Sequence, residues 1–458
     1  MLSLTGGFVS SQQKEKPNVI IILSDDQGWA DVGFNGATEI PTPNLDKLAS
    51  EGVRFTQGYA SHPYCSPSRA GLLSGRYQHR FGHENNLPYK NVTIEDGLPV
   101  EEKLISEVMK ENGYKTCAIG KWHLGDSARF WPSNRGFDDW YGFTGGGMSY
   151  WGKEGSDPSI SKVLRDGQGV PMDEITYLTD NFSDEAVNYI EEYTSKDQPY
   201  FMYLAYNAPH NPMHATREYL DVVDYIEYGD RGVYAAMVTG MDAGIGKVID
   251  KLKETGTYDN TLIFFYSDNG GAPENGSRNF PYRGHKGMLF EGGIRVPFLV
   301  TWPDQIDKGK DYHQPITALD IFPTILSATG ASTQKEAILD GRDLLPYLSG
   351  KEKKAPHETL FWRYSDGAGY AVRKGDYKMV MSGFKNDFFL FDMKSDPYEH
   401  VNLAARMPEK IEELKSLYAE WTKGTVSSLW QDPHLENVIK EEKALQQKFN
   451  KASAGERR

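Results

Sequence analysis

Mostly apolar segments alternate with amphipathic segments along the first three quarters of this chain, and they predict an α/β fold with a large, mostly parallel sheet between layers of helices. The apolar segments have the composition of strands that are buried on both faces of such a sheet. They lie at residues 19–23, 114–120, 199–206, 262–266 and 296–303. The predicted helices lie at residues 44–52, 102–113, 182–195, 232–256 and 316–330.

The pattern changes after about residue 345. Short aromatic and β-branched runs separated by Gly and Asp occupy 358–383 and 388–404, as in an antiparallel meander. A charged helical pattern at 408–424 then precedes a tail rich in Lys, Glu and Gln, for which we predict a solvated, fraying helix. We therefore predict a large domain over 17–345 and a smaller C-terminal α+β subdomain, with an antiparallel sheet and a charged helical tail, over 346–458.

The first 16 residues have a weak apolar patch followed by small and polar residues, as at the end of a secretory signal, but they lack a basic start. We interpret them as a signal remnant or a disordered arm. No apolar run approaches the roughly 20 residues that span a bilayer. The net charge of -14, from 50 basic and 64 acidic residues, argues against a nucleic-acid partner and against an anionic membrane surface. An anionic substrate would need a local basic pocket.

Acidic and amide side chains follow two of the predicted strands directly. Asp25 and Asp26 end the first strand, and Asp268 and Asn269 end the strand at 262–266. Either pair alone is ordinary turn chemistry. Together, after two apolar strands, they favour a site for a hard cation such as Ca²⁺ or Mg²⁺, which binds several oxygen ligands. Zinc is not favoured, because no His/Cys cluster has zinc-ligand spacing.

Cations and imidazoles also follow predicted strands. Lys121 and His123 follow the strand at 114–120, His210 follows the strand at 199–206, and Lys286 lies in a Gly-rich loop. Each alone is more simply a structural histidine or a solvated lysine. At one sheet edge, two histidines suit proton transfer near neutral pH, and two lysines suit an anion with several oxygens.

The segment YCSPSRAGLLSGR at 64–76 places one of the two cysteines of the chain at a predicted helix start. Pro67 suits a first helical turn, so Cys65 would meet free N–H groups that favour negative charge, with Arg69 one turn further on. A catalytic thiolate is one interpretation, but metal oxygens with an anion clamp fit hydrolysis of an oxyanion ester better. Cys117, in the strand at 114–120, is most simply a buried strand residue.

The segments CSPSR and LLSGR within 64–76 resemble the signature of the type I sulfatases, with Ser74 at a position where Thr is common. Five motifs match that family in order, and the resemblance extends to FDMKSDPYEHVNLA in the C-terminal region. It implies an alkaline-phosphatase-like fold, with 17–345 as the catalytic sulfatase domain. The motifs are NVIIILSDDQGWAD, GKWHLG, APHNP, YSDNGG and GHKG with EGGIRVP.

The resemblance also implies a role for each matched residue. Cys65 would be oxidised to Cα-formylglycine by a formylglycine-generating or anaerobic sulfatase-maturating enzyme, and the hydrated aldehyde would attack sulfur. Arg69 would stabilise that hydrate, Lys121 and Lys286 would hold the sulfate oxygens, His123 would bond the hydrate and serve as base, and His210 would protonate the leaving group. The implied ligands of one Ca²⁺ are Asp25, Asp26, Cys65 as formylglycine, Asp268 and Asn269.

The expected activity is removal of sulfate from a sulfated oligo- or polysaccharide by a periplasmic or secreted enzyme. Two alternatives stay open: a formylglycine-dependent phosphodiesterase or phosphonate monoester hydrolase, and a non-catalytic glycan-binding protein on the same fold. Several further residues are candidates for substrate contacts, although a packed aromatic or a solvated base is at least as simple an interpretation of each. They are Ser149, His79, Arg80, His83, Glu84, Asn85, His214, Trp362 and Arg363.

Overall fold

The structure is a computed structural model that describes residues 16–88, 93–151, 162–333, 338–382 and 387–431. The predicted N-terminal arm, apart from Lys16, and the predicted tail beyond residue 431 lie outside these residues. Among the described residues, no helix has both the length and the apolar character needed to cross a membrane.

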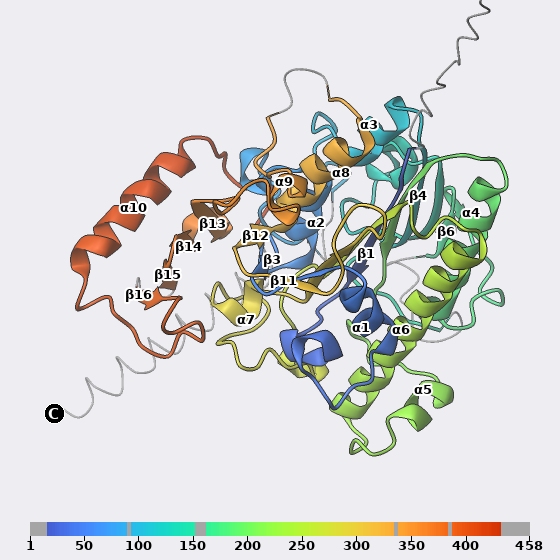
Figure 1. Ribbon diagram of the computed structural model, residues 1–458, viewed down its shortest axis with the longest axis horizontal. Coiled ribbons are helices and arrows are strands. Elements are labelled where there is room, and N and C mark those ends of the chain that lie inside the picture. Colours follow the sequence, from blue (N-terminus) through green and yellow to red (C-terminus); the bar gives the residue numbers. More distant parts are fainter. Residues whose placement is uncertain (1–15, 89–92, 152–161, 334–337, 383–386, 432–458) are drawn as a thin grey trace, which may run out of the picture.

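A large twisted sheet forms the centre of the molecule (Figure 1). Its strands are β1 (Asn18–Ser24), β2 (Val53–Phe55), β4 (Lys115–Lys121), β5 (Asp139–Phe143), β6 (Leu164–Arg165), β7 (Gln168–Gly169), β8 (Tyr200–Ala205), β9 (Thr261–Ser267), β10 (Phe298–Thr301) and β11 (Lys310–Tyr312). They are ordered β11-β2-β10-β9-β1-β8-β4-β5-β6-β7. A separate short pair joins β3 (Gly58–Tyr59) to β12 (Ile316–Thr317).

The central strands β9, β1, β8, β4 and β5 are all parallel. All of them except β5 lie in segments that the sequence predicts as strands of a mostly parallel sheet. The segment at 296–303 differs from the prediction, because β10 runs antiparallel to β9. A strand buried on both faces is apolar in either direction, so its composition does not reveal its orientation. The sheet is therefore mostly parallel, with antiparallel pairs at β10 and at β6 and β7.

Helices cover both faces of this sheet (Figure 1). Alternate residues of β1 enter two cores: Ile20 and Ile22 pack in one, and Val19, Ile21 and Leu23 in the other. Each such side chain contributes roughly 1.5–3 kcal/mol on burial. The first core is shared with α1 (Pro43–Ser50), α4 (Leu178–Thr194), α5 (Arg217–Val222) and α6 (Asp230–Glu254). The second is shared with α2 (Cys65–Ser74), α3 (Ile105–Glu111), α8 (Ile321–Thr329) and α9 (Leu345–Leu348).

The C-terminal region forms the predicted antiparallel meander, which confirms the α+β character of this part of the chain. Its strands are β13 (Thr359–Tyr364), β14 (Gly369–Lys374), β15 (Tyr377–Ser382) and β16 (Asp387–Asp392). One face packs on α10 (Pro408–Thr422), and the other packs on Tyr59 and on Ile294 of α7 (Glu291–Ile294). Both faces of the small sheet are therefore covered.

Candidate active site

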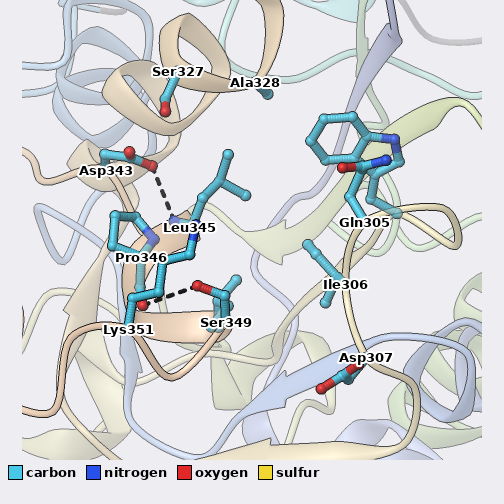
Figure 2. Close-up of a pocket in the computed structure, with 12 residues that line it drawn as sticks. Gln305, Ile306, Asp307, Ser327, Ala328, Asp343, Leu345, Pro346, Ser349 and Lys351 are labelled. Atoms are coloured by element: carbon cyan, nitrogen blue, oxygen red, sulfur yellow. Dashed lines mark hydrogen bonds between the residues drawn. The ribbon is translucent and has the colours of Figure 1, made fainter.

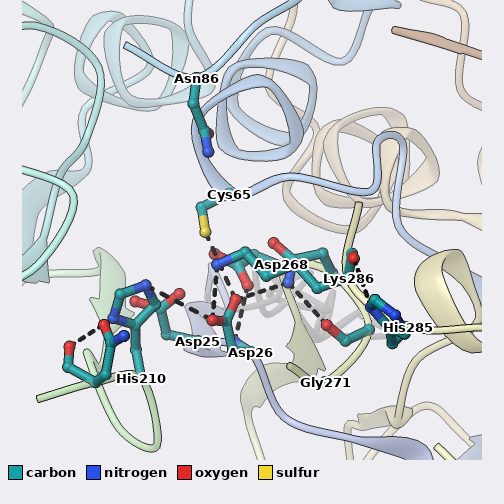
Figure 3. A network of polar contacts seen from close by, with 12 residues as sticks. Asp25, Asp26, Cys65, Asn86, His210, Asp268, Gly271, His285 and Lys286 are labelled. Atoms are coloured by element: carbon teal, nitrogen blue, oxygen red, sulfur yellow. Dashed lines mark hydrogen bonds and ion pairs between the residues drawn. The ribbon is translucent and has the colours of Figure 1, made fainter. Parts of the chain in front are cut away.

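The four predicted oxygen ligands meet at the carboxyl edge of the sheet, and Figure 3 shows Asp25, Asp26 and Asp268 there. Ser24 of β1 pairs with Ser267 of β9, so the residues that follow these strands emerge side by side. The Asn269 amide Nδ2 donates to Asp26 Oδ1 at 2.8 Å, and the Asp26 N–H donates to Asp268 Oδ1 at 3.3 Å. All of these side chains are buried. Parallel strand pairing thus builds a closely spaced carboxylate cluster.

Two residues at this edge have left-handed backbone conformations that are rare for residues other than glycine. Asp26 has φ 61°, and His123 has φ 56°. Such a conformation costs on the order of 1–2 kcal/mol per residue, and strain of this kind clusters at functional sites. The surrounding bonds therefore hold both side chains in positions that the local chain would not otherwise adopt.

Three cationic side chains pair with the carboxylates. Lys121 Nζ lies 2.6 Å from Asp25 Oδ2, and Lys286 Nζ lies 2.7 Å from Asp26 Oδ2. Arg69 is buried and lies 2.7 Å from Asp268 Oδ2 through one terminal nitrogen. These residues come from β4, from the loop before α7 and from α2, so segments far apart in sequence supply a positive lining.

These charges set the protonation of the carboxylates. Burial works to raise the pKa of Asp26, but the charges of Lys286, His210 and Lys121 hold it below its usual value. Burial and the neighbouring Asp25 raise the pKa of Asp268 to about 6, against the opposing charge of Arg69. Burial and mutual repulsion therefore disfavour the ionised carboxylates, and the neighbouring positive charges stabilise them.

Cys65 is the first residue of α2, as predicted, and its Sγ lies 3.7 Å from Asp26 Oδ1. Burial raises the pKa of the thiol well above its usual value, although Lys121 and Lys286 oppose the shift. The Asn86 side chain accepts a hydrogen bond from the backbone N–H of Ser66 at 3.1 Å. The side chain at position 65 thus enters the carboxylate cluster in a setting that disfavours a thiolate nucleophile.

Both predicted histidines belong to this site. His210 Nε2 lies 3.6 Å from Asp26 Oδ2 (Figure 3), while its Nδ1 bonds the carbonyl oxygen of Asn211 at 2.6 Å. Burial lowers the pKa of His210 to about 3, with Asp26 opposing and both lysines adding to the shift. Burial, Lys121 and Arg69 lower the pKa of His123 well below its usual value. Both imidazoles are therefore neutral before substrate binds.

Residues that the sequence did not single out complete the site. A Cβ atom at Gly146 would lie 2.7 Å from His123 Nε2, so only glycine allows this approach. Ser66 and Asn86 bond around the start of α2. The run of three glycines at 145–147 was a visible signal of close packing. The contacts of Ser66 and Asn86, in contrast, depend on tertiary structure alone.

The residues present fit a hard cation. Ligand atoms of Asp25, Asp26, Cys65 and His210 all lie within 4.8 Å of one another. Asp25 Oδ1 and Asn269 Oδ1 are buried and have no hydrogen-bond partner among the described residues. Unpartnered buried oxygens beside carboxylates are the donors that Ca²⁺ prefers.

Five of the residues predicted to contact substrate bond other parts of the protein around α2 and β13. Arg363 Nε donates to Glu84 Oε1 at 2.9 Å, His79 Nε2 bonds the Arg363 carbonyl oxygen at 2.9 Å, and Trp362 Nε1 donates to the Ala60 carbonyl oxygen at 2.9 Å. His83 bonds Ser66. All five side chains are buried with protein partners, and the substrate contacts predicted for them stay predictions.

The remaining candidates lie in three other places. Arg80 forms an ion pair with Asp340 at 2.6 Å and keeps about a quarter of its side chain exposed. Ser149 donates to the Trp151 carbonyl oxygen at 3.2 Å, and the ring of His214 lies 6.3 Å from the Trp151 ring. Asn85 bonds the carbonyl oxygen of Trp430. The substrate roles predicted for these residues stay predictions.

A cavity of about 500 Å³ lies elsewhere, between the segment after β10 and helices α8 and α9 (Figure 2). Gln305, Asp343 and Lys351 are among its lining residues. Because β10 runs antiparallel to β9, its carboxyl end lies at the sheet edge opposite to Asp268. This cavity is therefore separate from the strand-end cluster.

Comparison with known proteins gives consistent matches over most of the chain. The family model described as Sulfatase matches residues 17–331, and the model described as N-sulphoglucosamine sulphohydrolase, C-terminal, matches residues 283–425. The N-acetylgalactosamine-6-sulfatase of Mus musculus is 35% identical over 411 residues, which cover 85% of this chain and 76% of that protein. The uncharacterized sulfatase YdeN of Escherichia coli is 31% identical, covering 89% of this chain and 86% of that protein.

Solved structures match as well. The crystal structure of Ps i-CgsB has a TM-score of 0.87 and 37% sequence identity, and the match covers 92% of this chain and 96% of that chain. The same protein was solved in complex with k-i-k-neocarrahexaose. The match thus covers most of both chains.

Proposed function

Because this chain belongs to the sulfatase family, we propose that it hydrolyses sulfate esters of carbohydrates by means of a formylglycine at position 65. Its family and its named relatives make it a sulfatase. The observation that carries the proposal is the meeting of Cys65 with buried carboxylates and three cationic side chains at one sheet edge. That lining suits an anionic ester in a protein of net charge -14.

The setting of Cys65 supports its conversion to formylglycine. A thiolate nucleophile would need a lowered pKa, yet burial raises the pKa of this thiol. A hydrated aldehyde at the same position would carry two hydroxyl groups beside Asp26 and Arg69. The enzyme that converts Cys65 would be a formylglycine-generating or anaerobic sulfatase-maturating enzyme acting on the segment 65–69.

The proposed calcium ligands are Asp25, Asp26, Asp268, Asn269 and the modified residue 65. When bound, Ca²⁺ would supply positive charge to the oxygens of the sulfate group. Lys121 and Lys286 now pair with oxygens of Asp25 and Asp26. If those carboxylates held a cation, both ammonium groups would be free to hold sulfate oxygens.

Proton transfer falls to the two histidines. One hydroxyl of residue 65, beside Arg69, loses its proton to solvent and its oxygen bonds to sulfur. The bond from sulfur to the sugar oxygen breaks in the same step, and His210 donates a proton to that oxygen. His123 accepts the proton of the second hydroxyl of residue 65, so that sulfate leaves and the aldehyde re-forms. The neutral state of His210 fits this sequence, because a bound sulfate would raise its pKa and charge it only with substrate present.

We propose a sulfated oligo- or polysaccharide as substrate and, because such polymers do not cross membranes, a periplasmic or secreted location. Two similar proteins support this proposal. One is named N-acetylgalactosamine-6-sulfatase, and the other, Ps i-CgsB, was solved in complex with k-i-k-neocarrahexaose. A test panel therefore begins with carrageenan oligosaccharides and N-acetylgalactosamine 6-sulfate.

The test uses protein co-expressed with a formylglycine-generating enzyme and assays sulfate release by ion chromatography. We expect the wild type to release sulfate from at least one panel sugar and the Cys65→Ala variant to release none. Peptide mass of residue 65 and bound calcium are measured on the same samples. Absence of release from every sugar and from an aryl sulfate, with aldehyde and calcium present, would refute the proposal. Turnover of an aryl phosphodiester in place of sulfate esters would favour the phosphodiesterase alternative.

A further inference from the structure

We propose that Ser66 and His83 are positioning residues that fix the backbone of His123 relative to residue 65. This inference rests on the proposed function, in which His123 accepts a proton from residue 65. It assigns His83 a role in the interior of the site instead of the substrate contact that the sequence predicted.

The strained backbone of His123 is held by two hydrogen bonds. Its N–H donates to the carbonyl oxygen of Thr144 at 3.0 Å, and its carbonyl oxygen accepts from Ser66 Oγ at 2.7 Å. The left-handed φ of 56° is unfavourable without such support. Ser66 directly follows residue 65. Its hydrogen bond to the His123 carbonyl oxygen therefore fixes the position of His123, the proposed proton acceptor, relative to residue 65, the proton donor.

His83 completes this chain of bonds, and its tautomer follows from the partners. His83 Nε2 lies 2.6 Å from Ser66 Oγ. The single hydroxyl proton of Ser66 goes to the His123 carbonyl oxygen, because a carbonyl can only accept. His83 must therefore donate from Nε2. Burial, with the nearby charge of Arg135, lowers the pKa of His83 to about 3, which agrees with a neutral ring.

The surroundings keep the chain of bonds dry and rigid. The side chains of Ser66 and His83 are fully buried. The Trp430 ring packs edge-on against His83, with 4.7 Å between ring centroids, and its Nε1 donates to the Asn86 carbonyl oxygen at 2.8 Å. The Asn86 side chain in turn accepts from the Ser66 N–H. Water cannot replace the Ser66 hydroxyl at low cost in such a site.

The first test removes or keeps the Ser66 hydroxyl. We expect Ser66→Ala to lower kcat about 10- to 100-fold, as loss of supporting groups around a reactive site typically does, and to change KM less than threefold. Ser66→Thr keeps a hydroxyl and should retain most of the activity. Ser74→Ala, a buried serine at the other end of α2 whose hydroxyl bonds Ala70, is the matched control. Formylglycine content is measured by peptide mass for every variant, and rates are expressed per converted enzyme.

The second test separates positioning from general stability. If Ser66 acts through His123, Ser66→Ala should have no further effect on kcat in a His123→Ala background. His83→Gln keeps an N–H donor near the Nε2 position and should restore most of the kcat that His83→Leu loses. Multiplicative losses in the double variant, or equal kcat losses for Gln and Leu at position 83 that follow the melting temperature, would overturn the inference.

The outcome is distinguishable from failure of the proposed function. Sulfate release by the wild type establishes that function before any variant is compared. Unchanged kcat of fully converted Ser66→Ala would then refute the positioning role alone.

Discussion

At the residue scale, Asp25, Asp26 and Asp268 lie together in the interior beside Lys121, Lys286 and Arg69. Buried charges of one sign are expensive unless charges of the other sign neutralise them. The two lysines provide this balance in the absence of a cation, and a bound Ca²⁺ would take it over. In the proposed reaction, the two lysines that neutralise these carboxylates would also bind sulfate.

Calcium removal should abolish sulfate release, and calcium should raise the melting temperature of the protein, because the cation binds only the folded chain. The expected gain is about 2.7 kcal/mol at a calcium concentration 100 times Kd. Thermal unfolding of EGTA-treated enzyme with and without added Ca²⁺ measures it. Asp25→Asn should lose the response, whereas Asp242→Asn, at a buried carboxylate beside α1, should keep it. Full activity in excess EGTA would contradict the calcium assignment.

Acidification should destabilise the protein through its buried histidines. Burial, with the charge of Arg363, lowers the pKa of His79 to about 3. The unfolded chain therefore binds more protons than the folded one between pH 3 and 6.5, and stability falls as pH falls through this window. For His79 the loss between pH 7 and pH 5 should be about 2 kcal/mol. Urea unfolding at both pH values measures it, and an equal loss in His79→Gln would disprove the assignment.

The sequence could predict the cluster of carboxylates at the sheet edge, but it could not predict the buried ion pairs that surround the site. Asp25 and Asp268 each follow a continuous apolar strand, so their place at the sheet edge is a local property of the chain. Glu84 and Arg363 are 279 residues apart and pair only through tertiary packing. Nothing in their own segments distinguishes this buried pair from a substrate contact.

At the scale of elements, β4 and β8 approach so closely that a glycine is required. Gly120 has φ 97°, and a Cβ there would lie 1.9 Å from the Ala205 carbonyl oxygen. Lys121 and His123 follow it directly. The strand pairing that delivers these two residues thus depends on position 120.

Gly120→Ala should destabilise the protein by more than the backbone strain alone, because the methyl group must push the two strands apart. Gly256 has φ 70° but open space around its Cβ position. Gly256→Ala should therefore cost only about 1–2 kcal/mol, and Gly120→Ala at least twice as much. Urea unfolding of both variants provides the comparison. Equal losses would show that the close approach of the strands has no energetic consequence.

Element type was easier to predict than element direction or packing. Apolar runs located β1, β4, β8 and β9 within one or two residues. They could not give the antiparallel direction of β10, because a doubly buried strand has the same composition either way. The sequence also could not predict which face of the C-terminal sheet packs on the large domain, because both faces carry aromatic residues.

At the scale of the whole molecule, a buried ion-pair network joins the C-terminal sheet to the active-site loop. Lys378 of β15 lies 2.8 Å from Glu291, the first residue of α7, and 2.8 Å from Glu399. Burial raises the pKa of Glu399 to about 7, with Lys378 opposing and Glu291 adding to the shift. Because α7 follows the loop that carries Lys286, the C-terminal sheet supports the loop for which we propose a sulfate contact.

Lys378→Met should destabilise the protein by about 3–5 kcal/mol, because it leaves the buried carboxylate of Glu399 without its cation. Adding Glu399→Gln should recover part of this loss. Lys374→Met, on the adjacent strand, removes a partly exposed pair with Glu413 and should cost about 1 kcal/mol or less. Urea unfolding tests all three variants. A loss for Lys378→Met no larger than that for Lys374→Met would contradict the supporting role.

The most direct test of the central claim is the dependence of sulfate release on the formylglycine content of residue 65. Preparations made with graded amounts of maturating enzyme are analysed by peptide mass and assayed on one sulfated oligosaccharide. We expect the rate per enzyme to rise in proportion to the converted fraction and to extrapolate to zero for unconverted Cys65. A rate that does not change with the converted fraction would contradict the account, because catalysis would then not proceed through residue 65.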